Sequence, residues 1–234
     1  IPREEGVPQG SPLSPLLSNI MLTELDWELE RRGLKFCRYA DDCNVYVKSE
    51  KAAERVLASL TRYVEEVLKL RVNRDKSGTF RPCDSVFLGY SFSRGNYSRI
   101  VVAKKPFKRL KNKLRHIFRT ARGTSLKTTI QRLTPILRGW RQYFKLDERK
   151  RVFEELDAHI RRHLRKLIWI AWKNPKTRER NLLKRGLPPF NAWKSSVNGR
   201  GKWWNAGAPH MNIAFPRHVF ARLGLYSLAS MAIC

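Results

Sequence analysis

Apolar residues recur along the chain with a spacing that changes from region to region. Between residues 11 and 29 they return every three or four positions behind a Gly/Pro-rich entry, which predicts a helix that starts near Ser14. Two short β-prone runs follow, Phe36 to Tyr39 and Val45 to Val47. They flank Ala40-Asp41-Asp42-Cys43-Asn44, so we expect a hairpin with carboxylates at its turn.

A second amphipathic helix and further strands complete the first part of the chain. Apolar positions from Ala53 to Leu68 have helical spacing. Short runs at Leu70 to Val72, Val86 to Phe92 and Ile100 to Ala103 are typical of strands. This mixture predicts an α+β arrangement over residues 1–103, in which an antiparallel sheet carries packed helices.

After Lys104 the apolar spacing is helical throughout and predicts an all-helical bundle. Thr134-Pro135 is typical of an N-cap followed by proline at the first helical position, so a helix should restart there. The last stretch combines Gly, Pro and Asn with many aromatic residues, and we expect it to pack on the bundle or on a partner. The predicted parts are residues 1–103, the helical domain 104–187, and a loop-rich, aromatic segment 188–234.

The charge of the chain points to a polyanionic partner. There are 48 Lys and Arg residues against 20 Asp and Glu, a net charge of +28. Up to Ala103 the chain has 16 basic and 14 acidic residues, whereas the remainder has 32 basic and 6 acidic. Residues 104–146 contain 14 basic residues and no acidic one, which favours phosphate contacts over an ordinary solvated face. We therefore expect a nucleic acid to bind the helical part.

Cysteine usage and hydropathy bear on the location of the protein. The four cysteines form neither a CxxC pair nor a disulfide framework, which favours a reducing, intracellular setting. No apolar run of about 18 residues and no signal-peptide pattern is visible, so we expect no membrane partner. The first residues lack an initiator Met and look like an interior cut.

Adjacent carboxylates at Asp41 and Asp42 suggest phosphoryl-transfer chemistry. On a tight turn, their oxygens would suit hard divalent cations, and two such ions stabilise the attacking and leaving oxygens of an in-line displacement. By itself the pair is a weak signal, because Asp is a favoured turn residue in any protein.

The surrounding motifs resemble those of reverse transcriptases. Tyr39-Ala40-Asp41-Asp42 resembles their catalytic tetrapeptide, and the fourteen residues from Gly6 to Asn19 resemble the block that lies under primer-template and incoming nucleotide. Asn73 to Ser77 resembles the block after the palm helix, with Asp75 where Glu is more usual. Phe87-Leu88-Gly89-Tyr90 resembles the primer-grip hairpin.

The second half is similar to bacterial group II intron reverse transcriptase/maturases. Leu137-Arg138-Gly139-Trp140 resembles part of their maturase or thumb domain, and residues 199–212 resemble the ending of members that lack an endonuclease domain. The resemblance implies a palm subdomain over 1–103 and a basic thumb after it. It makes a retron or retroviral assignment less favoured, and it places the protein in the bacterial cytoplasm.

The resemblance also implies a set of functional residues. Asp41 and Asp42 would bind Mg²⁺, and Lys76 would neutralise or protonate the leaving pyrophosphate. The partners implied are group II intron RNA, an RNA template, a DNA primer and a dNTP. The residues expected to contact nucleic acid are Gln9, Gly10, Phe87, Leu88, Gly89, Lys108, Lys111, Arg115, Arg138 and Arg141.

One departure from the family's pattern limits the expected activity. The family's metal site uses a further Asp from a motif tens of residues before the Pro-Gln-Gly block, and only five residues precede Gly6 here. We expect that Asp and the fingers region to be missing, so the isolated chain should not polymerise. The alternatives are a non-enzymatic RNA-binding maturase and a CRISPR-associated or diversity-generating reverse transcriptase.

Three other aromatic or imidazole features have less weight. His159 and His163 stand four apart on one predicted helix, a spacing that suits a metal, but without an evident third ligand we expect packing or RNA contact. Trp140 and Trp169 occupy apolar positions and are expected in the core. Trp203 and Trp204 are adjacent, so both cannot face one core from a single helix or strand.

Overall fold

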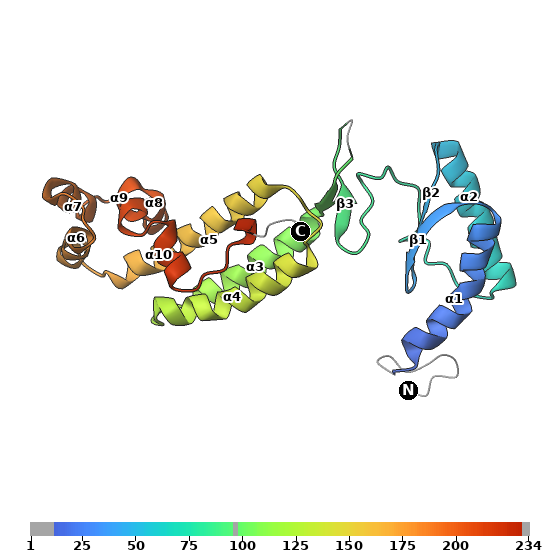
Figure 1. Cartoon of the computed structure of the whole chain (residues 1–234), viewed down its shortest axis with the longest axis horizontal. Helices are drawn as coiled ribbons and strands as arrows, with labels where there is room; N and C mark the ends of the chain where they lie inside the picture. The colour runs from blue at the N-terminus through green and yellow to red at the C-terminus, as the bar shows by residue number, and fades with distance from the viewer. Residues whose placement is uncertain (1–11, 96–97, 231–234) are drawn as a thin grey trace. The chain divides into compact units, whose positions relative to one another are not determined.

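The computed structural model describes residues 12–95 and 98–230, and its contacts divide the chain into two compact units (Figure 1). The first unit is Ile1–Leu88 and the second is Gly89–Cys234. The predicted boundary after Ala103 concerns family domains and stays a prediction.

The first unit contains two helices and one hairpin. Its elements are α1 (Ser14–Arg31), β1 (Lys35–Tyr39), β2 (Asp42–Tyr46), α2 (Glu50–Arg62) and a π-helical turn η1 (Tyr63–Val67). β1 and β2 are antiparallel, with Cys37 opposite Asn44. The helix start at Ser14 and the hairpin were predicted from the sequence and are confirmed.

The strand predicted at Leu70 to Val72 is wrong, because the backbone there is irregular. Lys69 takes a φ of +55°, and the Leu70 amide donates to the Val64 carbonyl over 3.0 Å. This contact ends the helical segment by turning the chain back on η1, which removes the extended backbone that a strand needs.

The second unit is a helical assembly preceded by a short hairpin. Its elements are β3 (Tyr90–Phe92), β4 (Ile100–Val102), α3 (Lys104–Thr120), α4 (Leu126–Tyr143), α5 (Lys150–Ala171), α6 (Pro175–Lys184), α7 (Pro189–Ser196), α8 (Lys202–Gly207), α9 (Pro209–Ala214), α10 (Arg217–Arg222) and the 3-10 turn η2 (Leu228–Ser230). β3 and β4 are antiparallel. The α+β class is therefore confirmed, but the described strands form two separate two-stranded sheets and not one.

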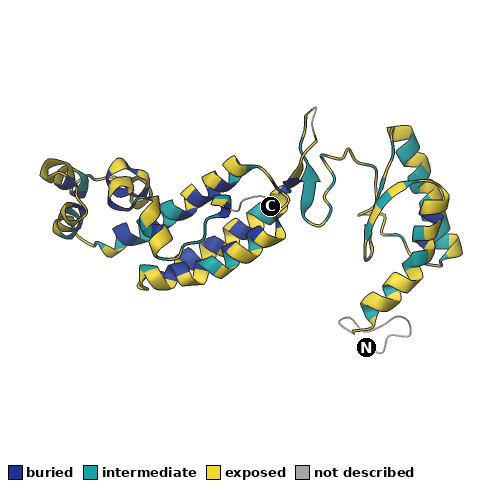
Figure 2. Cartoon of the chain, viewed as in Figure 1, coloured by how far each residue is buried: buried dark blue, intermediate teal, exposed yellow. Residues whose placement is uncertain are grey.

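The core of the second unit lies along α5. One face of this helix is buried, as Figure 2 shows in dark blue, and includes Phe153, Ile160, Leu164 and Trp169. Against it pack apolar residues of α3, α4 and the last short helices, among them Leu114, Leu133, Met211, Phe220 and Leu228. Residues 188–230 thus pack on the bundle as expected, but as short helices and not as a loop-rich segment.

An ion pair with a buried carboxylate holds the β3–β4 hairpin to the connection between α4 and α5. The Asp147 side chain is 0% exposed and accepts from the Val102 amide over 2.7 Å and from the Arg149 side chain. Arg149 also donates to the Val102 carbonyl over 3.2 Å. Burial raises the pKa of the Asp147 carboxyl, but hydrogen bonds from Arg149 and the Val102 amide outweigh it and lower that pKa.

The predicted break in the helix at Thr134-Pro135 is wrong, because α4 runs through Pro135 without interruption. Thr134 does not act as an N-cap; its hydroxyl donates to the Gly224 carbonyl over 2.8 Å. Buried Leu133 and Leu137 on either side fix the helix against the core, which offsets the hydrogen bond that proline cannot donate.

Among the helices of residues 12–95 and 98–230, none has the length and apolar character needed to cross a membrane.

Candidate catalytic turn and nucleic-acid interface

The Asp41-Asp42 pair lies at the turn of the β1–β2 hairpin. Asp42 is the first residue of β2 and stands opposite Tyr39, while Ala40 takes a φ of +53° to reverse the chain. Both aspartates are exposed. Within the described residues, neither carboxylate takes part in a side-chain hydrogen bond or ion pair, so their oxygens face solvent and are available to a cation.

Arg38 fixes this turn to α1, a role that sequence reasoning missed. Its guanidinium pairs with the carboxylate of Asp26, donating from Nε to Oδ1 over 2.7 Å. It also donates to Asn19 Oδ1 over 3.1 Å and to the Ala40 carbonyl over 2.9 Å. Hydrogen bonding to Asp26 raises the pKa of Arg38. The spacing of Asp26 and Arg38 gave no sign of the contact, because it depends on how the hairpin packs on α1.

Of the other residues predicted around the catalytic turn, the structure describes Lys76 but not Gln9 and Gly10. Gln9 and Gly10 lie outside the described residues. Lys76 is exposed in a turn, where its amide donates to the Asn73 carbonyl over 3.2 Å. No contact joins its ammonium to Asp41 or Asp42 within residues 12–95, so its proposed catalytic role stays a prediction.

Phe87-Leu88-Gly89-Tyr90 forms a tight turn. Leu88 and Gly89 both have positive φ, +51° and +79°, the combination used by type I′ turns. Two features favour glycine at position 89. Its φ is positive, and a Cβ there would lie 3.1 Å from the Phe144 ring. Tyr90 packs edge-on against Phe144 and donates to the Tyr143 carbonyl over 2.6 Å. The contact of Phe87, Leu88 and Gly89 with a primer stays a prediction.

Helix α3 presents a basic stripe. Lys108, Lys111 and Arg115 are exposed at helical spacing, while Leu110 and Leu114 on the adjoining inner face are buried. The helix contains no acidic residue, so nothing on α3 neutralises the stripe. Such a surface attracts phosphates strongly at low salt.

Of the two arginines expected to face RNA from α4, one is exposed and one is not. Arg138 is exposed, with its guanidinium 5.8 Å from the Tyr226 ring. Arg141 is 4% exposed, so the expectation that it faces RNA is wrong. Its guanidinium donates to the carbonyls of Leu228 over 3.0 Å and Phe144 over 2.6 Å. Position 141 follows buried Leu137 by one helical turn, which places it on the core side.

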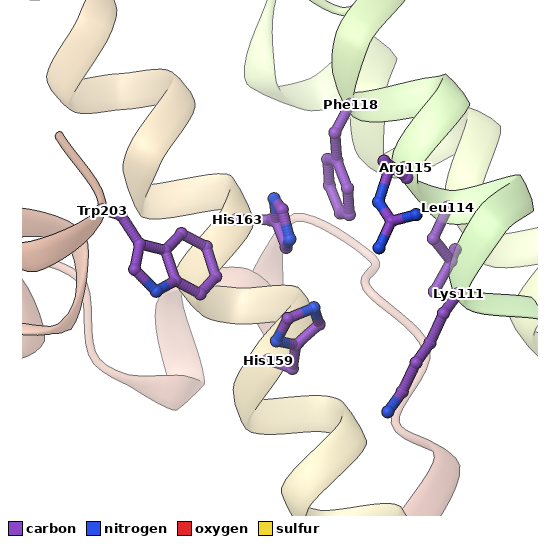
Figure 3. Close-up of a pocket in the computed structure, with 7 residues that line it drawn as sticks. All are labelled: Lys111, Leu114, Arg115, Phe118, His159, His163 and Trp203. Carbon is purple, nitrogen blue, oxygen red and sulfur yellow. The ribbon is translucent and has the colours of Figure 1, made fainter. Parts of the chain in front are cut away.

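A cavity of about 390 Å³ lies between α3, α5 and α8 in the second unit (Figure 3). It is lined by Lys111, Leu114, Arg115, Phe118, His159, His163 and Trp203. His163 stacks on Phe118 with ring centroids 4.5 Å apart and planes 5° apart. Burial first, and then neighbouring cations, lower the pKa of His163 to about 4 and also lower that of His159. The histidines were expected to pack or to contact RNA; the cavity that they share with Trp203 could not be predicted from the sequence.

Residues 12–95 and 98–230 contain no group of three or more His, Cys, Asp or Glu side chains arranged to hold a metal ion. The exposed oxygens of Asp41 and Asp42 are the hard donors that Mg²⁺ prefers, and they fit such an ion as two ligands of a larger set. His159 and His163, 4.7 Å apart between ring centroids, lie against aromatic rings.

Comparison with known proteins matches two adjoining families. The model described as "Reverse transcriptase (RNA-dependent DNA polymerase)" matches residues 1–92. The model described as "Group II intron, maturase-specific domain" matches residues 96–186. The second match begins inside the β3–β4 hairpin and ends just after α6, so it covers the basic stripe of α3 and most of the bundle.

Individual relatives are similar over parts of the chain. Protein YkfC of Escherichia coli (strain K12) is 34% identical, over 46% of this chain and 38% of its own length. The retron Mx65 reverse transcriptase of Myxococcus xanthus is 42% identical, over 30% of this chain and 17% of its own. The retron Ec86 reverse transcriptase of Escherichia coli is 27% identical, over 48% of this chain and 35% of its own. The chain thus spans well under half the length of the curated relatives that it matches.

Proposed function

This chain belongs to the reverse transcriptases that carry a group II intron maturase-specific domain, and on that premise we propose that it is part of an RNA-directed DNA polymerase that also binds intron RNA and assists splicing. In this proposal the first unit contributes to the palm, and the helices of the second unit form the thumb. One observation carries the proposal: the same chain contains an exposed Asp41-Asp42 turn and, in its second unit, a basic helix α3 without acidic residues.

In DNA synthesis, Asp41 and Asp42 would hold Mg²⁺ through their carboxylates. When bound, Mg²⁺ stabilises charge on the attacking and leaving oxygens of phosphoryl transfer. Arg38 would position the site, since it donates to the Ala40 carbonyl within the turn. Lys76 would donate to the leaving pyrophosphate, and the other participants would be an RNA template, a DNA primer and a dNTP.

In RNA binding, the basic stripe of α3 would contact the phosphates of structured RNA. Lys108, Lys111 and Arg115 share one exposed side, and Arg138 adds a cation from α4. The buried core behind the stripe fixes the backbone positions that carry these cations, which suits recognition of RNA by shape and backbone.

Two other functions have observations in their favour. Retron reverse transcriptases are among the relatives, so a retron reverse transcriptase is a candidate. The maturase-specific match over residues 96–186 favours an intron protein instead. A non-enzymatic RNA-binding maturase would need the stripe of α3 and not the carboxylates of Asp41 and Asp42.

The experiment that tests RNA binding is a salt titration of affinity for a structured intron RNA. Each phosphate contact contributes about 0.7 to 0.9 to the slope of log affinity against log salt. The triple variant K108E/K111E/R115E should lower the slope by about 2 to 3. The control K51E/R55E/R62E reverses three exposed cations of α2 and changes net charge equally. An RNA affinity that does not change with salt concentration would contradict the proposal that the α3 stripe binds RNA. An equal loss of affinity in both triple variants would contradict it as well.

A further inference from the structure

The cavity between α3, α5 and α8 is bounded by one aromatic side and one cationic side, as Figure 3 shows. Its volume of about 390 Å³ lies in the range of roughly 300–1,000 Å³ that small-ligand sites occupy. None of the seven lining residues is acidic. An occupant with a flat ring and an attached anion would match both sides.

The aromatic side consists of stacked and tilted rings. His163 lies between Phe118 and Trp203, with centroid separations of 4.5 Å and 4.7 Å. His159 is exposed, with its ring 5.6 Å from that of Trp203. Trp203 itself is 36% exposed, so part of its surface is open to an incoming ring.

Trp203 is held in place by Arg162. The Arg162 guanidinium lies 4.3 Å from the Trp203 ring centroid, and its Nη2 donates to the Trp203 carbonyl over 2.9 Å. Gly207 leaves room for this arginine, because a Cβ there would lie 2.7 Å from the guanidinium and would make it shift. The aromatic side is therefore organised before any ligand binds, which lowers the entropic cost of stacking.

The cationic side belongs to the basic stripe. Lys111 and Arg115 are exposed on α3 and line the cavity, while Lys108 continues the stripe one turn earlier. An RNA backbone that follows the stripe would therefore pass the mouth of the cavity. Because burial and neighbouring cations keep His163 neutral at pH 7, its ring offers one hydrogen-bond donor and one acceptor instead of a further charge.

We propose that this cavity takes one unpaired nucleobase of a bound RNA, stacked against His159 and Trp203, with its phosphate on Lys111 and Arg115. The inference rests on the proposed function, since it needs an RNA along α3. Unpaired bases stacked on aromatic side chains are the usual means by which proteins read single-stranded or bulged RNA. The absence of a carboxylate among the lining residues disfavours a cationic ligand.

The test uses three RNA hairpins that are identical except at one position: a bulged adenosine, an abasic bulge, and a fully paired stem. At one salt concentration, the chain should bind the bulged adenosine about 5- to 100-fold more tightly than the abasic RNA, as expected for one stacked base. A 2-aminopurine in the bulge should lose fluorescence on binding.

Variants separate the cavity from the rest of the surface. His159→Ala and Trp203→Leu should reduce the preference for the bulged base to less than about twofold. The matched control is Trp193→Leu, which removes a tryptophan that is 52% exposed and lies tilted against Phe190 outside the cavity. It should leave the preference unchanged. His159 is exposed, so H159A tests the idea even where W203L disturbs folding.

The outcomes distinguish this inference from the function on which it rests. Salt-dependent binding of all three RNAs with equal affinity would overturn the cavity as a base site and leave RNA binding along α3 intact. Failure to bind any of the hairpins or the intron RNA would overturn both. If both cavity variants still prefer the bulged adenosine to the abasic RNA, the base binds elsewhere.

Discussion

Arg38 and Asp26 join the β1–β2 hairpin to α1 through a hydrogen bond of 2.7 Å between Nε and Oδ1. The Arg38 side chain is 12% exposed, so solvent screens the pair only in part. The same guanidinium donates to the Ala40 carbonyl, directly before Asp41. The position of the carboxylate turn therefore depends on Asp26 of α1.

Arg38→Ala should loosen the hairpin, because it removes this ion pair and the bond to the Ala40 carbonyl. We expect amide hydrogens of residues 35–46 to exchange about 10- to 100-fold faster, equivalent to a loss of roughly 1.4 to 3 kcal/mol. Hydrogen-exchange mass spectrometry measures this locally. Arg31→Ala is the control, since that side chain is 75% exposed in its pair with Glu28 and should change the rate less than threefold. Equal effects of the two variants would show that Arg38 has no special role.

Elements with strong local signals were predictable from the sequence. The start of α1 at Ser14 and the hairpin at Asp41-Asp42 follow from helical spacing and from β-prone runs around a turn. The bundle after Lys104 follows from its long amphipathic pattern. Trp169, expected in the core from its apolar position, is 2% exposed.

The errors come from tertiary packing that overrides a local signal. Pro135 resembles a helix start, yet packing of Leu133 and Leu137 holds α4 continuous through it. Arg141 looks like a surface cation, yet its donors satisfy backbone carbonyls at the end of α4 and in η2. The cavity around His163 joins residues from α3, α5 and α8, so no single stretch of sequence reveals it.

Arg141 and Arg138 should separate stability from RNA binding. Arg141→Ala removes the side-chain donor to the buried carbonyls of Leu228 and Phe144, and it removes a cation 4.3 Å from the Phe153 ring centroid, so we expect a loss of about 2 to 4 kcal/mol in the free energy of unfolding. Arg138→Ala, at an exposed position, should change stability by less than about 0.5 kcal/mol and instead weaken RNA binding. Urea denaturation followed by circular dichroism gives the stabilities. A stable R141A protein with weakened RNA binding would restore the original expectation for this residue.

The free energy of unfolding should fall as the pH is lowered from about 6.5 toward 4. His163 has a pKa lowered to about 4 from the ordinary 6.5, so the unfolded chain binds its proton more tightly than the folded chain does. Stability is therefore full above pH 6.5 and is lost as the pH falls toward the folded pKa, by at most about 1.4 kcal/mol per pH unit for one histidine. The groups that disfavour its protonation are His159, Lys166, Arg115 and Arg162.

His163→Phe keeps a ring against Phe118 but cannot titrate, so the difference in stability between this variant and the native chain isolates the histidine. We expect the variant to lose less stability between pH 6.5 and pH 4.5, measured by urea denaturation at each pH. His218→Phe, at an exposed position of α10, controls for the loss of a histidine. Parallel pH profiles of H163F and the native chain would mean that His163 is not the group responsible.

Asp41→Asn should separate DNA synthesis from RNA binding in a polymerase that contains this chain. The substitution keeps the shape of the side chain and removes the charge that a divalent cation needs, so primer extension should fall by at least about a hundredfold. RNA affinity should stay within about twofold, because the proposed phosphate contacts come from Lys108, Lys111 and Arg115 on α3. Primer extension and splicing are measured on each variant at one salt concentration, with K108E/K111E/R115E as the converse case in which both activities weaken through lost affinity. If Asp41→Asn stops splicing as completely as synthesis while the β1–β2 amides keep their native exchange rates, the two functions share the carboxylate turn and are not separable.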